Sequence, residues 1–594
     1  MEKNKFSVKK YLSLWPECLV LLLCAVLLSL GISGKKGYHM DELLSFELAN
    51  AEFNPWIVPT QPQGRLAKFV EREIRGDSAA QTFGNLWNVA VDVLKNRGGS
   101  KLLSYQADVY PEPVWISRET FTEYVTVNRL DDFNYLSVYF NVKDDNHPPL
   151  HFMLLHTVSS LFKEKLSPVM GCAINLCFVL GIMILLMRIG RICMTLMGCG
   201  EWGRLAGLAA AAVYGVSAGA LSTTLLIRMY AMVTFFCTWL LYLHLEKLYH
   251  ERLFGEGLLR TDAGFDKKNK LLILATLLGF WTQYFFLFYC LTIAGVTAWI
   301  LWRRKRTKEL LHYVVSMVTA AVIGLLAFPF AVSDVFASGR GVEALGNLGS
   351  GLGDLGIRLK AFLEILGTAV GMPCIFVLLL INFSWGYLRL RGVKLEKGLL
   401  AVLLIPVIAY FLLAAKLSPF LVDRYVMPVF PLVTLLLVVG ACGCLASLLR
   451  EKIKKMTLLL TVLMGALILT QPFMPGHTDN AYLYPEYAEQ EEIAKEYAGI
   501  PCICVYEGVG YYENLPEFMQ YEKTLLVTLP ELQGREERDS IEALDQVAVL
   551  MKNKAWAKDV ESVMKTYGLK PEAVAYETAS EGGDYLLIYG KDQD

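Results

Sequence analysis

The feature that most constrains the fold of this chain is a series of apolar runs, each long enough to cross a lipid bilayer. The first covers residues 12–33, and similar runs recur up to about residue 475. A helix of about 20 apolar residues crosses the hydrocarbon layer, and a helix satisfies its own backbone hydrogen bonds where water is absent. Charged residues are only 19% of the sequence, so most of the chain cannot face water. The sequence therefore predicts an α-helical polytopic membrane protein.

Basic clusters between the apolar runs indicate the topology. Four lysines precede the first run, and further clusters follow at residues 188–204, 247–270, 303–308, 389–397 and 450–455. Short loops rich in Lys and Arg stay in the cytoplasm. The spans that separate these clusters are expected near residues 12–33, 168–187, 205–223, 229–247, 311–333, 359–386, 398–415, 425–447 and 457–475. The first run is too long for a signal-peptide core, so we expect a retained anchor.

Two further apolar runs decide the number of crossings. Residues 271–302 have basic groups at both ends and would be about 48 Å long as one helix, so we expect two short helices that turn at 281–284. The run at 148–165 begins with Pro148-Pro149, and counting it as a span would place Arg188 and Arg191 outside. We therefore expect 148–165 to lie on the outer interface. The result is about eleven spans of the plasma membrane, with the N-terminus cytoplasmic and the C-terminal domain extracytoplasmic.

The composition changes sharply near residue 476. Residues 1–475 are predicted to be the membrane module, with a first outer loop at 34–147 that carries juxtamembrane helices. Residues 476–594 combine acidic clusters with short strand-like runs at 503–506, 524–528, 547–551 and 585–589, which predicts a small α/β domain. Cys502 and Cys504 share one strand face and are expected to be buried without bonding each other. The first outer loop contains no cysteine, which excludes a disulfide framework or a CxxC zinc site there.

The chemistry is expected on the outer rim of the membrane. The sequence contains no phosphate-binding GxxxxGK[ST] loop, and its cytoplasmic loops are too short for a nucleotide-binding domain. Ionisable residues are rare inside the spans, whereas transporters usually carry them near the bilayer midplane. Polar residues gather instead just outside the predicted span ends. These patterns disfavour a nucleotide-driven engine and a transporter, and no nucleic-acid partner is expected.

The first outer cluster follows the first span and contains His39, Asp41 and Glu42. Two adjacent carboxylates near the membrane suit a transferase, in which one of them accepts the proton of the acceptor hydroxyl or amine. The alternative is structural, because acidic residues also favour the first turn of a helix.

The second outer cluster closes the same loop and contains Asp145 and His147, directly before Pro148-Pro149. The two prolines force an extended entry and then start a helix, so the polar side chains are held in place. The alternative is a helix cap beside a solvated acidic run. If the loop ends meet, His39, Asp41, Asp145 and His147 could also hold a divalent metal ion, although they have no metal-site spacing.

The third group is basic and contains two Arg–Tyr motifs on the outer side. Its members are Arg228, Tyr230, Lys416, Arg424 and Tyr425. A guanidinium fork suits the phosphate of a leaving lipid carrier, which gains negative charge in the transition state. The alternative is an Arg beside a Tyr at a membrane interface, with Asp423 as its partner. Arg340 is a weaker candidate of the same kind, and Tyr284 in the 281–284 turn is expected to line the pocket.

In combination these residues resemble the GT-C glycosyltransferases. The resemblance covers residues 10–475 and rests on Asp41-Glu42, the segment 147–150 (His-Pro-Pro-Leu), Arg228-Met229-Tyr230 and Arg424-Tyr425. The most similar branches are the protein O-mannosyltransferase-like family 39 enzymes and the aminoarabinose transferases of lipid A. The resemblance implies an inverting transfer from a polyprenyl-phosphate sugar, with Asp41 as the base and the arginines at the donor phosphate. It also implies that residues 148–165 pack near the catalytic pocket.

The chain departs from this family at three places. Gln283 stands where relatives often have His, and His151 stands where an aromatic residue is usual. The C-terminal domain does not resemble the β-trefoil of the eukaryotic mannosyltransferases. The identity of the acceptor therefore cannot be transferred from either branch.

The sequence favours an enzyme that moves a sugar from a polyprenyl-phosphate donor to a cell-wall polymer, a glycolipid or a protein hydroxyl. In this interpretation Glu42 and Asp145 position the acceptor, and His147 orients it. Two alternatives remain open. One is a flippase or transporter of lipid-linked sugars, and the other is an inactive GT-C scaffold that binds a partner through its C-terminal domain.

Overall fold

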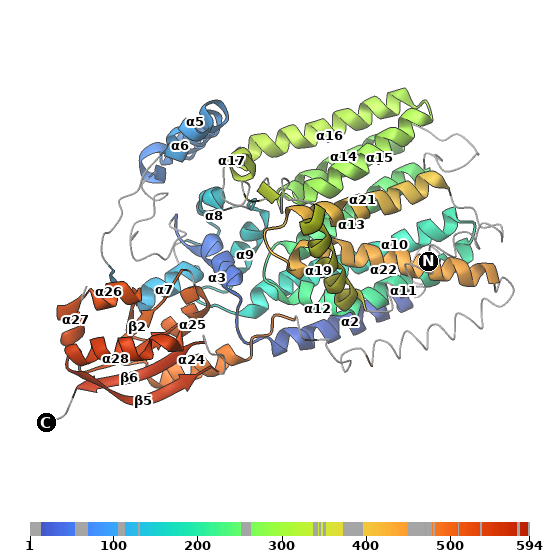
Figure 1. Ribbon diagram of the computed structural model, residues 1–594. Coiled ribbons are helices and arrows are strands. Elements are labelled where there is room, and N and C mark those ends of the chain that lie inside the picture. Colours follow the sequence, from blue (N-terminus) through green and yellow to red (C-terminus); the bar gives the residue numbers. More distant parts are fainter. Residues whose placement is uncertain are drawn as a thin grey trace, which may run out of the picture. The chain divides into compact units, whose positions relative to one another are not determined.

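The computed structural model describes residues 14–53, 69–104, 113–128, 131–145, 147–250, 263–336, 343, 346–347, 352–371, 396–448, 470, 478, 481–508, 510–534, 537–578 and 583–591 (Figure 1). The chain forms two compact units. The helical unit comprises Met1–Ser33, Asn146–His151 and Cys172–Ala481, and the sheet unit comprises Gly34–Asp145, Phe152–Gly171 and Tyr482–Asp594. The protein is thus mostly helical, with a small α/β region near its C-terminus, as predicted.

The helical unit is built from long apolar helices. Among the described residues, six are long and apolar enough to cross a bilayer, and a bent pair of helices is a seventh candidate. The described helices of 18 residues or more in this unit, whether or not they are apolar enough to cross a bilayer, are α2 (Trp15–Gly34), α10 (Pro168–Leu196), α13 (Tyr230–His250), α14 (Ala263–Phe280), α15 (Phe286–Arg303), α16 (Thr307–Ala327), α19 (Leu352–Val370), α21 (Lys397–Leu417) and α22 (Phe430–Leu448). The bent pair is α11 (Gly203–Gly215) with α12 (Ala218–Leu225). The expected span at 457–475 lies almost wholly outside the described residues, so the total of eleven stays a prediction.

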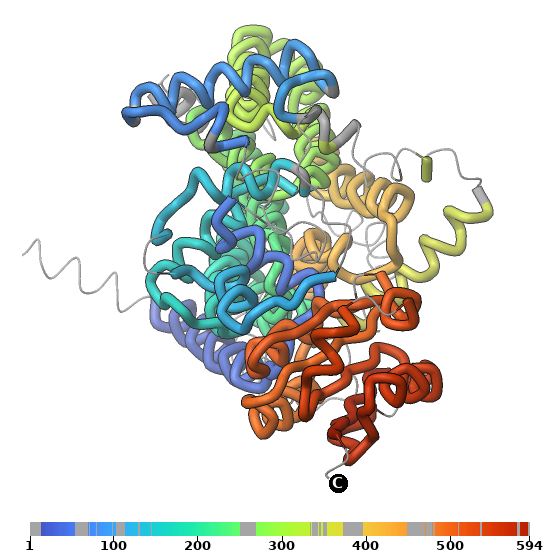
Figure 2. The backbone as a smooth tube through the Cα atoms, turned by 90° about the vertical axis from the view of Figure 1, so that its left-hand side faces the viewer, coloured from blue at the N-terminus to red at the C-terminus, as the bar shows by residue number. Residues whose placement is uncertain are grey.

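The run at 271–302 is divided into two helices, as expected. Helix α14 ends at Phe280 and α15 begins at Phe286, so the chain turns between them. The indole N–H of Trp281, in this turn, donates to the carbonyl oxygen of Gly324 on α16 at 3.2 Å. A Cβ atom at Gly324 would lie 2.9 Å from the Phe280 ring, so the glycine permits this close approach. Helices α14, α15 and α16 consequently lie side by side (Figures 1 and 2).

One buried carboxylate ties three helix ends together in the helical unit. Glu17, in the first turn of α2, accepts hydrogen bonds from Arg191 of α10 and from both Nε and Nη2 of Arg204 in α11, the latter two at 3.0 and 2.7 Å. The start of α2 therefore lies beside the C-terminal part of α10, which means that these two helices run antiparallel. The expected helix at 148–165 is present as α9 (Leu150–Leu161) and starts directly after the two prolines. Its place at the membrane interface stays a prediction.

The sheet unit contains a six-stranded sheet in the order β1-β3-β2-β4-β6-β5. The strands are β1 (Trp115–Ser117), β2 (Cys502–Val505), β3 (Lys523–Val527), β4 (Gln546–Met551), β5 (Leu569–Glu577) and β6 (Tyr585–Lys591). Strands β3, β2 and β4 are parallel, with Cys502 opposite Thr524 and Ala548, whereas the outer strands are antiparallel. Four strands occupy the predicted runs, and β1 and β5 were not predicted.

Helices cover the sheet on both faces. Val505, Val527 and Val549 point to one face, where they pack with residues of α26 (Leu529–Gln533), α27 (Arg538–Glu542) and α28 (Ala557–Thr566). Alternation along β2 turns Cys502 and Cys504 to the opposite face. Both cysteines are buried and free, as expected. The remaining helices of the unit include α3 (Met40–Asn50), α5 (Ala79–Asn96), α7 (Arg118–Val125), α8 (Tyr135–Asn141), α24 (Glu486–Glu496) and α25 (Leu515–Phe518).

Strand β1 comes from the first outer loop and completes a sheet that is otherwise made by the C-terminal region. It pairs antiparallel with β3, and the next residue, Arg118, donates to the carbonyl oxygens of Tyr521 and Ala498 at 2.9 and 2.7 Å. The indole N–H of Trp115 also donates to Ser540 Oγ at 3.0 Å. The first loop and the C-terminal region therefore fold as one unit, which the composition change near residue 476 had not indicated.

A buried polar network lies at the end of this sheet. Glu517 accepts hydrogen bonds from Asn514, Tyr521 and Tyr576, each at 2.9 Å. Lys552 donates to Asp584 at 2.7 Å and thereby compensates its charge. Burial, with a further contribution from the nearby Asp584, raises the pKa of Glu517 to about 7 even though these hydrogen bonds act to lower it.

The raised pKa predicts that the sheet unit loses stability as the pH rises. Protonated Glu517 is favoured in the folded state, so its stabilising effect is complete below the ordinary glutamate pKa and is lost as the pH rises toward 7. The expected loss in the free energy of unfolding is on the order of 3 kcal/mol. Amide exchange of β2, β3 and β4 in the full chain, corrected for intrinsic rates, measures it between pH 4.5 and 8.

The Glu517→Gln variant should remove most of this pH dependence. The control is Glu561→Gln, because Glu561 forms only an exposed ion pair with Lys565. An unchanged pH slope in Glu517→Gln would contradict the assignment.

Candidate active site

Helix α3 positions the first acidic cluster. Its N-cap is His39, whose Nδ1 accepts the backbone N–H of Asp41 at 3.0 Å. Glu42 closes the capping box by accepting the backbone N–H of His39 at 2.7 Å. Glu42 also pairs with Lys35 Nζ at 2.9 Å, and both side chains are fully buried. The structural role considered for this cluster thus applies to Glu42, and the N-cap itself is His39.

Asp41 is the more accessible carboxylate of the pair. Its side chain is 18% exposed, and its Oδ2 lies 3.6 Å from His39 Nδ1. Because Nδ1 already accepts a backbone N–H, the proton of neutral His39 sits on Nε2, and the ring does not donate to Asp41. The helix therefore holds the partly accessible Asp41 carboxylate at its N-terminus.

The second cluster is divided between the two units. Asp145 is buried and follows the 3-10 turn η3 (Val142–Asp144) of the sheet unit. His147 belongs to the helical unit and is half-buried. Its Nδ1 lies 3.4 Å from Nη2 of Arg228. The structure thus joins His147 to the first of the two predicted Arg–Tyr motifs.

Arg228 is held in an apolar setting. It lies between α12 and α13 and is only 3% exposed. Asn175, a buried residue of α10, donates through its side-chain amide to the carbonyl oxygens of Thr224 and Leu226, the latter two residues before Arg228. This polar side chain in the apolar N-terminal half of α10 therefore fixes the end of α12. A guanidinium in such a place binds an anion more strongly than it would in water.

The two Arg–Tyr motifs meet through their aromatic rings. The ring centroids of Tyr230 and Tyr425 are 6.3 Å apart with an edge-to-face geometry, and Phe285 lies 5.6 Å from Tyr425. The guanidinium carbon of Arg424 lies 5.6 Å from the centre of the Tyr425 ring. Tyr410 donates through its hydroxyl to the carbonyl oxygen of Tyr425 at 3.1 Å. Tyr230 and Tyr425, almost 200 positions apart in the sequence, therefore belong to one aromatic cluster beside Arg424.

The 281–284 turn contacts the start of α9. The backbone N–H of Leu150 donates to the carbonyl oxygen of Trp281 at 3.1 Å. Tyr284, expected to line a pocket, donates to Asp334 Oδ2 at 2.6 Å. Its hydroxyl is thus engaged by an acidic residue that follows α16, in α17 (Ala331–Phe336).

The predicted basic group also includes Lys416 and Arg340. Lys416 lies half-buried in the last turn of α21, close in sequence to the η5 turn (Asp423–Tyr425). Arg340 lies outside the described residues. Within the described part of the chain, no group of three or more His, Cys, Asp or Glu side chains could hold a metal ion.

Sequence reasoning missed three residues of this site, namely Lys35, Asn175 and Asp334. Asn175 carried a usable signal, because an amide in an apolar span must find a partner. The Lys35 side chain has no such signal, since a lysine just after a span is usually an interfacial anchor. Its burial becomes visible only once the C-terminal region is folded beside it.

Comparisons with known proteins identify no family. The sequence matches no protein-family model and no curated protein. Among solved structures, ArnT from Cupriavidus metallidurans bound to undecaprenyl phosphate is 15% identical with a TM-score of 0.42. The apo state of that ArnT is 14% identical with a TM-score of 0.40. Each alignment covers 86% of this chain and 98% of the other.

Proposed function

We propose that this protein is an inverting glycosyltransferase of the GT-C type that takes its sugar from a polyprenyl phosphate. The observation that carries the proposal is the contact of Tyr230 with Tyr425 in the apolar helical unit, which joins the motif of the buried Arg228 to that of Arg424. Two guanidinium groups from these motifs would fit a phosphate whose lipid chain lies among apolar helices. A soluble nucleotide donor would have no need for such a setting.

The proposed step is a single displacement at the anomeric carbon. An acceptor oxygen attacks this carbon as its bond to the phosphate oxygen breaks, so the configuration inverts. The bonding electron pair leaves with the polyprenyl phosphate, and Arg228 and Arg424 stabilise the charge that develops there. The acceptor proton passes to the Asp41 carboxylate, which is the more accessible acid at the start of α3.

The remaining polar residues take supporting roles in this proposal. Glu42 keeps α3 capped rather than moving a proton, because its buried carboxylate is held by Lys35 and the His39 N–H. His147 orients Arg228 through the contact at 3.4 Å. We further assign Asp145 and His39 of the sheet unit to acceptor binding, and Tyr284 and Lys416 of the helical unit to pocket lining and donor binding respectively. No metal ion is required by this step.

The proposed location is the outer face of the plasma membrane. Basic loops favour a cytoplasmic N-terminus, which places the first outer loop and the C-terminal domain outside. A cell-wall polymer or a glycolipid is the preferred acceptor, ahead of a protein hydroxyl. The donor sugar can be of the kind used by the family 39 branch or by the aminoarabinose-transferase branch.

Replacing Asp41 with Asn should abolish transfer without abolishing donor binding. Loss of a general base lowers kcat by roughly 100-fold to 10,000-fold. The measurement uses purified full-length protein in lipid, radiolabelled undecaprenyl-phosphate sugars and a panel of acceptors. Asp132→Asn is the matched control, since Asp132 forms a half-exposed ion pair with Lys163 in the same unit.

Three outcomes of this experiment discriminate between a metal-independent enzyme, a metal-dependent enzyme, and a flippase or inactive scaffold. Transfer by the wild type that is lost only in Asp41→Asn supports the enzyme and its base. Donor binding without transfer in the wild type points to a flippase or an inactive scaffold. Transfer that is lost after chelation of divalent metal ions would instead show that the reaction needs such an ion.

Replacing Arg228 with Lys should weaken donor binding about tenfold, which corresponds to about 1.4 kcal/mol. Lysine keeps the charge but loses the fork that can bind two phosphate oxygens. Titration with undecaprenyl phosphate alone measures the effect. Arg204→Lys is the control, because Arg204 pairs with Glu17 at the far end of the α11–α12 pair. If Arg228→Lys and Arg204→Lys bind undecaprenyl phosphate with equal affinity, Arg228 has a packing role and does not bind the phosphate.

A further inference from the structure

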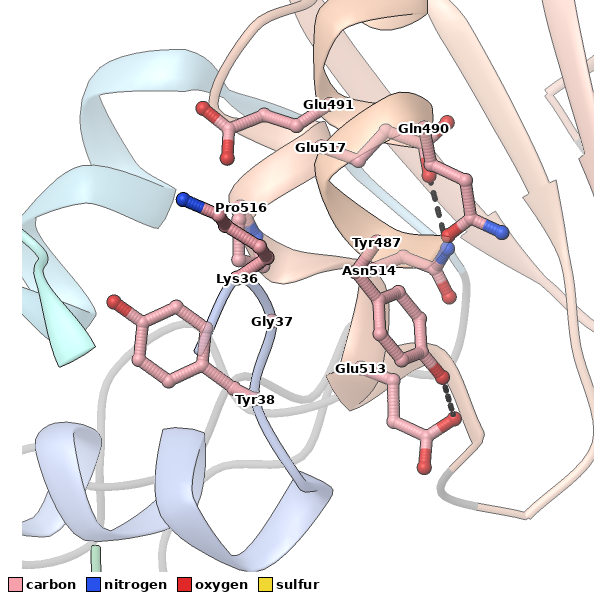
Figure 3. A pocket seen from close by; sticks show the side chains of 10 residues that line it. All are labelled: Lys36, Gly37, Tyr38, Tyr487, Gln490, Glu491, Glu513, Asn514, Pro516 and Glu517. Atoms are coloured by element: carbon pink, nitrogen blue, oxygen red, sulfur yellow. Dashed lines mark hydrogen bonds between the residues drawn. The ribbon is translucent and has the colours of Figure 1, made fainter. Parts of the chain in front are cut away.

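The loop that precedes α3 is hydrogen-bonded to a short segment of the C-terminal region within the sheet unit. We call residues 35–39 the cap loop and residues 482–487 the tyrosine segment. The backbone N–H groups of Lys36 and Gly37 both donate to the carbonyl oxygen of Leu483, at 2.8 and 3.4 Å. Figure 3 shows Gly37 and Tyr487 facing each other at this contact. Segments more than 400 residues apart are thus joined directly beside the proposed base.

Lys35 connects the two segments through its side chain. Its ammonium group pairs with Glu42 at 2.9 Å and donates to the carbonyl oxygen of Tyr482 at 2.6 Å. It also lies 5.2 Å from the centre of the Tyr484 ring. A buried ammonium group is tolerated only when such partners surround it. The charge of Lys35 is therefore compensated jointly by the capping-box glutamate and by the tyrosine segment.

The backbone of the tyrosine segment is strained at two positions. Tyr482 and Tyr484 have φ values of 52° and 48°, in the left-handed region that side-chain-bearing residues seldom adopt. Such strain persists only where surrounding contacts enforce it, and it tends to occur at functional sites. Here the strained backbone places the rings of Tyr482 and Tyr484 so that each ring centroid lies 6.4 Å from the centroid of the His39 ring. His39 is the N-cap of α3, and its Nδ1 accepts the backbone N–H of Asp41.

The contact is too tight to be a ligand site itself. A cavity of about 10 Å³ lies between the cap loop and α24–α25, enough for about one water molecule (Figure 3). A Cβ atom at Gly37 would lie 2.7 Å from Tyr487 Cβ and 2.9 Å from Tyr484 Cβ. Any side chain at position 37 must therefore push the tyrosine segment away.

We propose that the tyrosine segment contributes to the active site, because it holds the Asp41 carboxylate in position through Lys35. This inference rests on the proposed role of Asp41 as the base. Lys35 is a positioning residue, because it acts on Asp41 through the Glu42 capping box and never touches the substrate. The C-terminal region thus sets the geometry of the carboxylate and is more than a binding appendage.

The test compares Lys35→Met with the double variant Lys35→Met/Glu42→Gln in full-length protein. The single variant leaves the Glu42 charge buried without its cation, so the capping box should open and Asp41 should shift. We expect kcat to fall by about 100-fold, the scale for a catalytic group misplaced by about 1 Å, with undecaprenyl phosphate affinity unchanged. Gln at position 42 keeps the hydrogen-bond acceptor without the charge. The double variant should therefore recover about tenfold of the lost kcat, as expected for coupled residues.

A glycine pair provides a matched steric test. Gly37→Ala should displace the tyrosine segment and lower kcat. Gly34→Ala is the control, because its Cβ would lie 3.7 Å from Leu483 Cδ2, an ordinary contact. Amide exchange of residues 40–45 is measured in the same proteins, and it should accelerate in Lys35→Met and Gly37→Ala but not in Gly34→Ala.

The two readouts separate this proposal from the proposed function. If the wild type transfers no sugar, the proposed function fails, whereas the exchange rates still show whether the tyrosine segment holds α3. Unchanged exchange in both Lys35→Met and Gly37→Ala would overturn the positioning role. A double variant as slow as Lys35→Met would also overturn it, since Glu42 would then act on the substrate directly.

Discussion

The part of the sheet unit around helix α3 depends on one electrostatic constraint, the burial of the Lys35–Glu42 ion pair. Two charges removed from water are tolerable only with complete hydrogen bonding. Glu42 meets this need with the His39 N–H, and Lys35 meets it with the carbonyl oxygen of Tyr482. The capping of α3, the path of the cap loop and the strained tyrosine segment all follow from that requirement. Asp41 remains the accessible acid because its neighbour is fully engaged.

Much of the architecture was predictable because it depends on local patterns. Apolar runs and basic clusters indicate the long helices, and short strand-like runs indicate four of the six strands. The two prolines before Leu150 mark the start of α9 correctly. Strand β5 escaped prediction because it lies at the sheet edge and is mostly exposed, so its sequence lacks a buried pattern. Strand β1 has only three residues and exists only through its pairing with β3. The Lys35 network is likewise a product of tertiary structure.

The Arg–Tyr motifs of the helical unit depend on a different physical constraint. Here polar groups are placed one at a time in an apolar bundle, so each requires a specific neighbour. Asn175 holds the backbone before Arg228, His147 contacts its guanidinium, and the Tyr425 ring lies under Arg424. The Arg–Tyr motifs were visible in the sequence, but their meeting depends on helix packing that no local pattern encodes. The structure thus brings the two separate motifs into contact through Tyr230 and Tyr425.

The pairing of β1 with β3 has a consequence for how the protein is made. A hydrogen-bonded sheet cannot be shared across a bilayer, so an even number of crossings must separate residues 117 and 523. About 400 residues are synthesised between these strands, which takes roughly 20 to 80 s at 5–20 residues per second. Throughout that time β1, in the first outer loop, lacks its pairing partner β3. The segment that carries Asp41 can therefore reach its final form only after Leu483 and strand β3 have been synthesised.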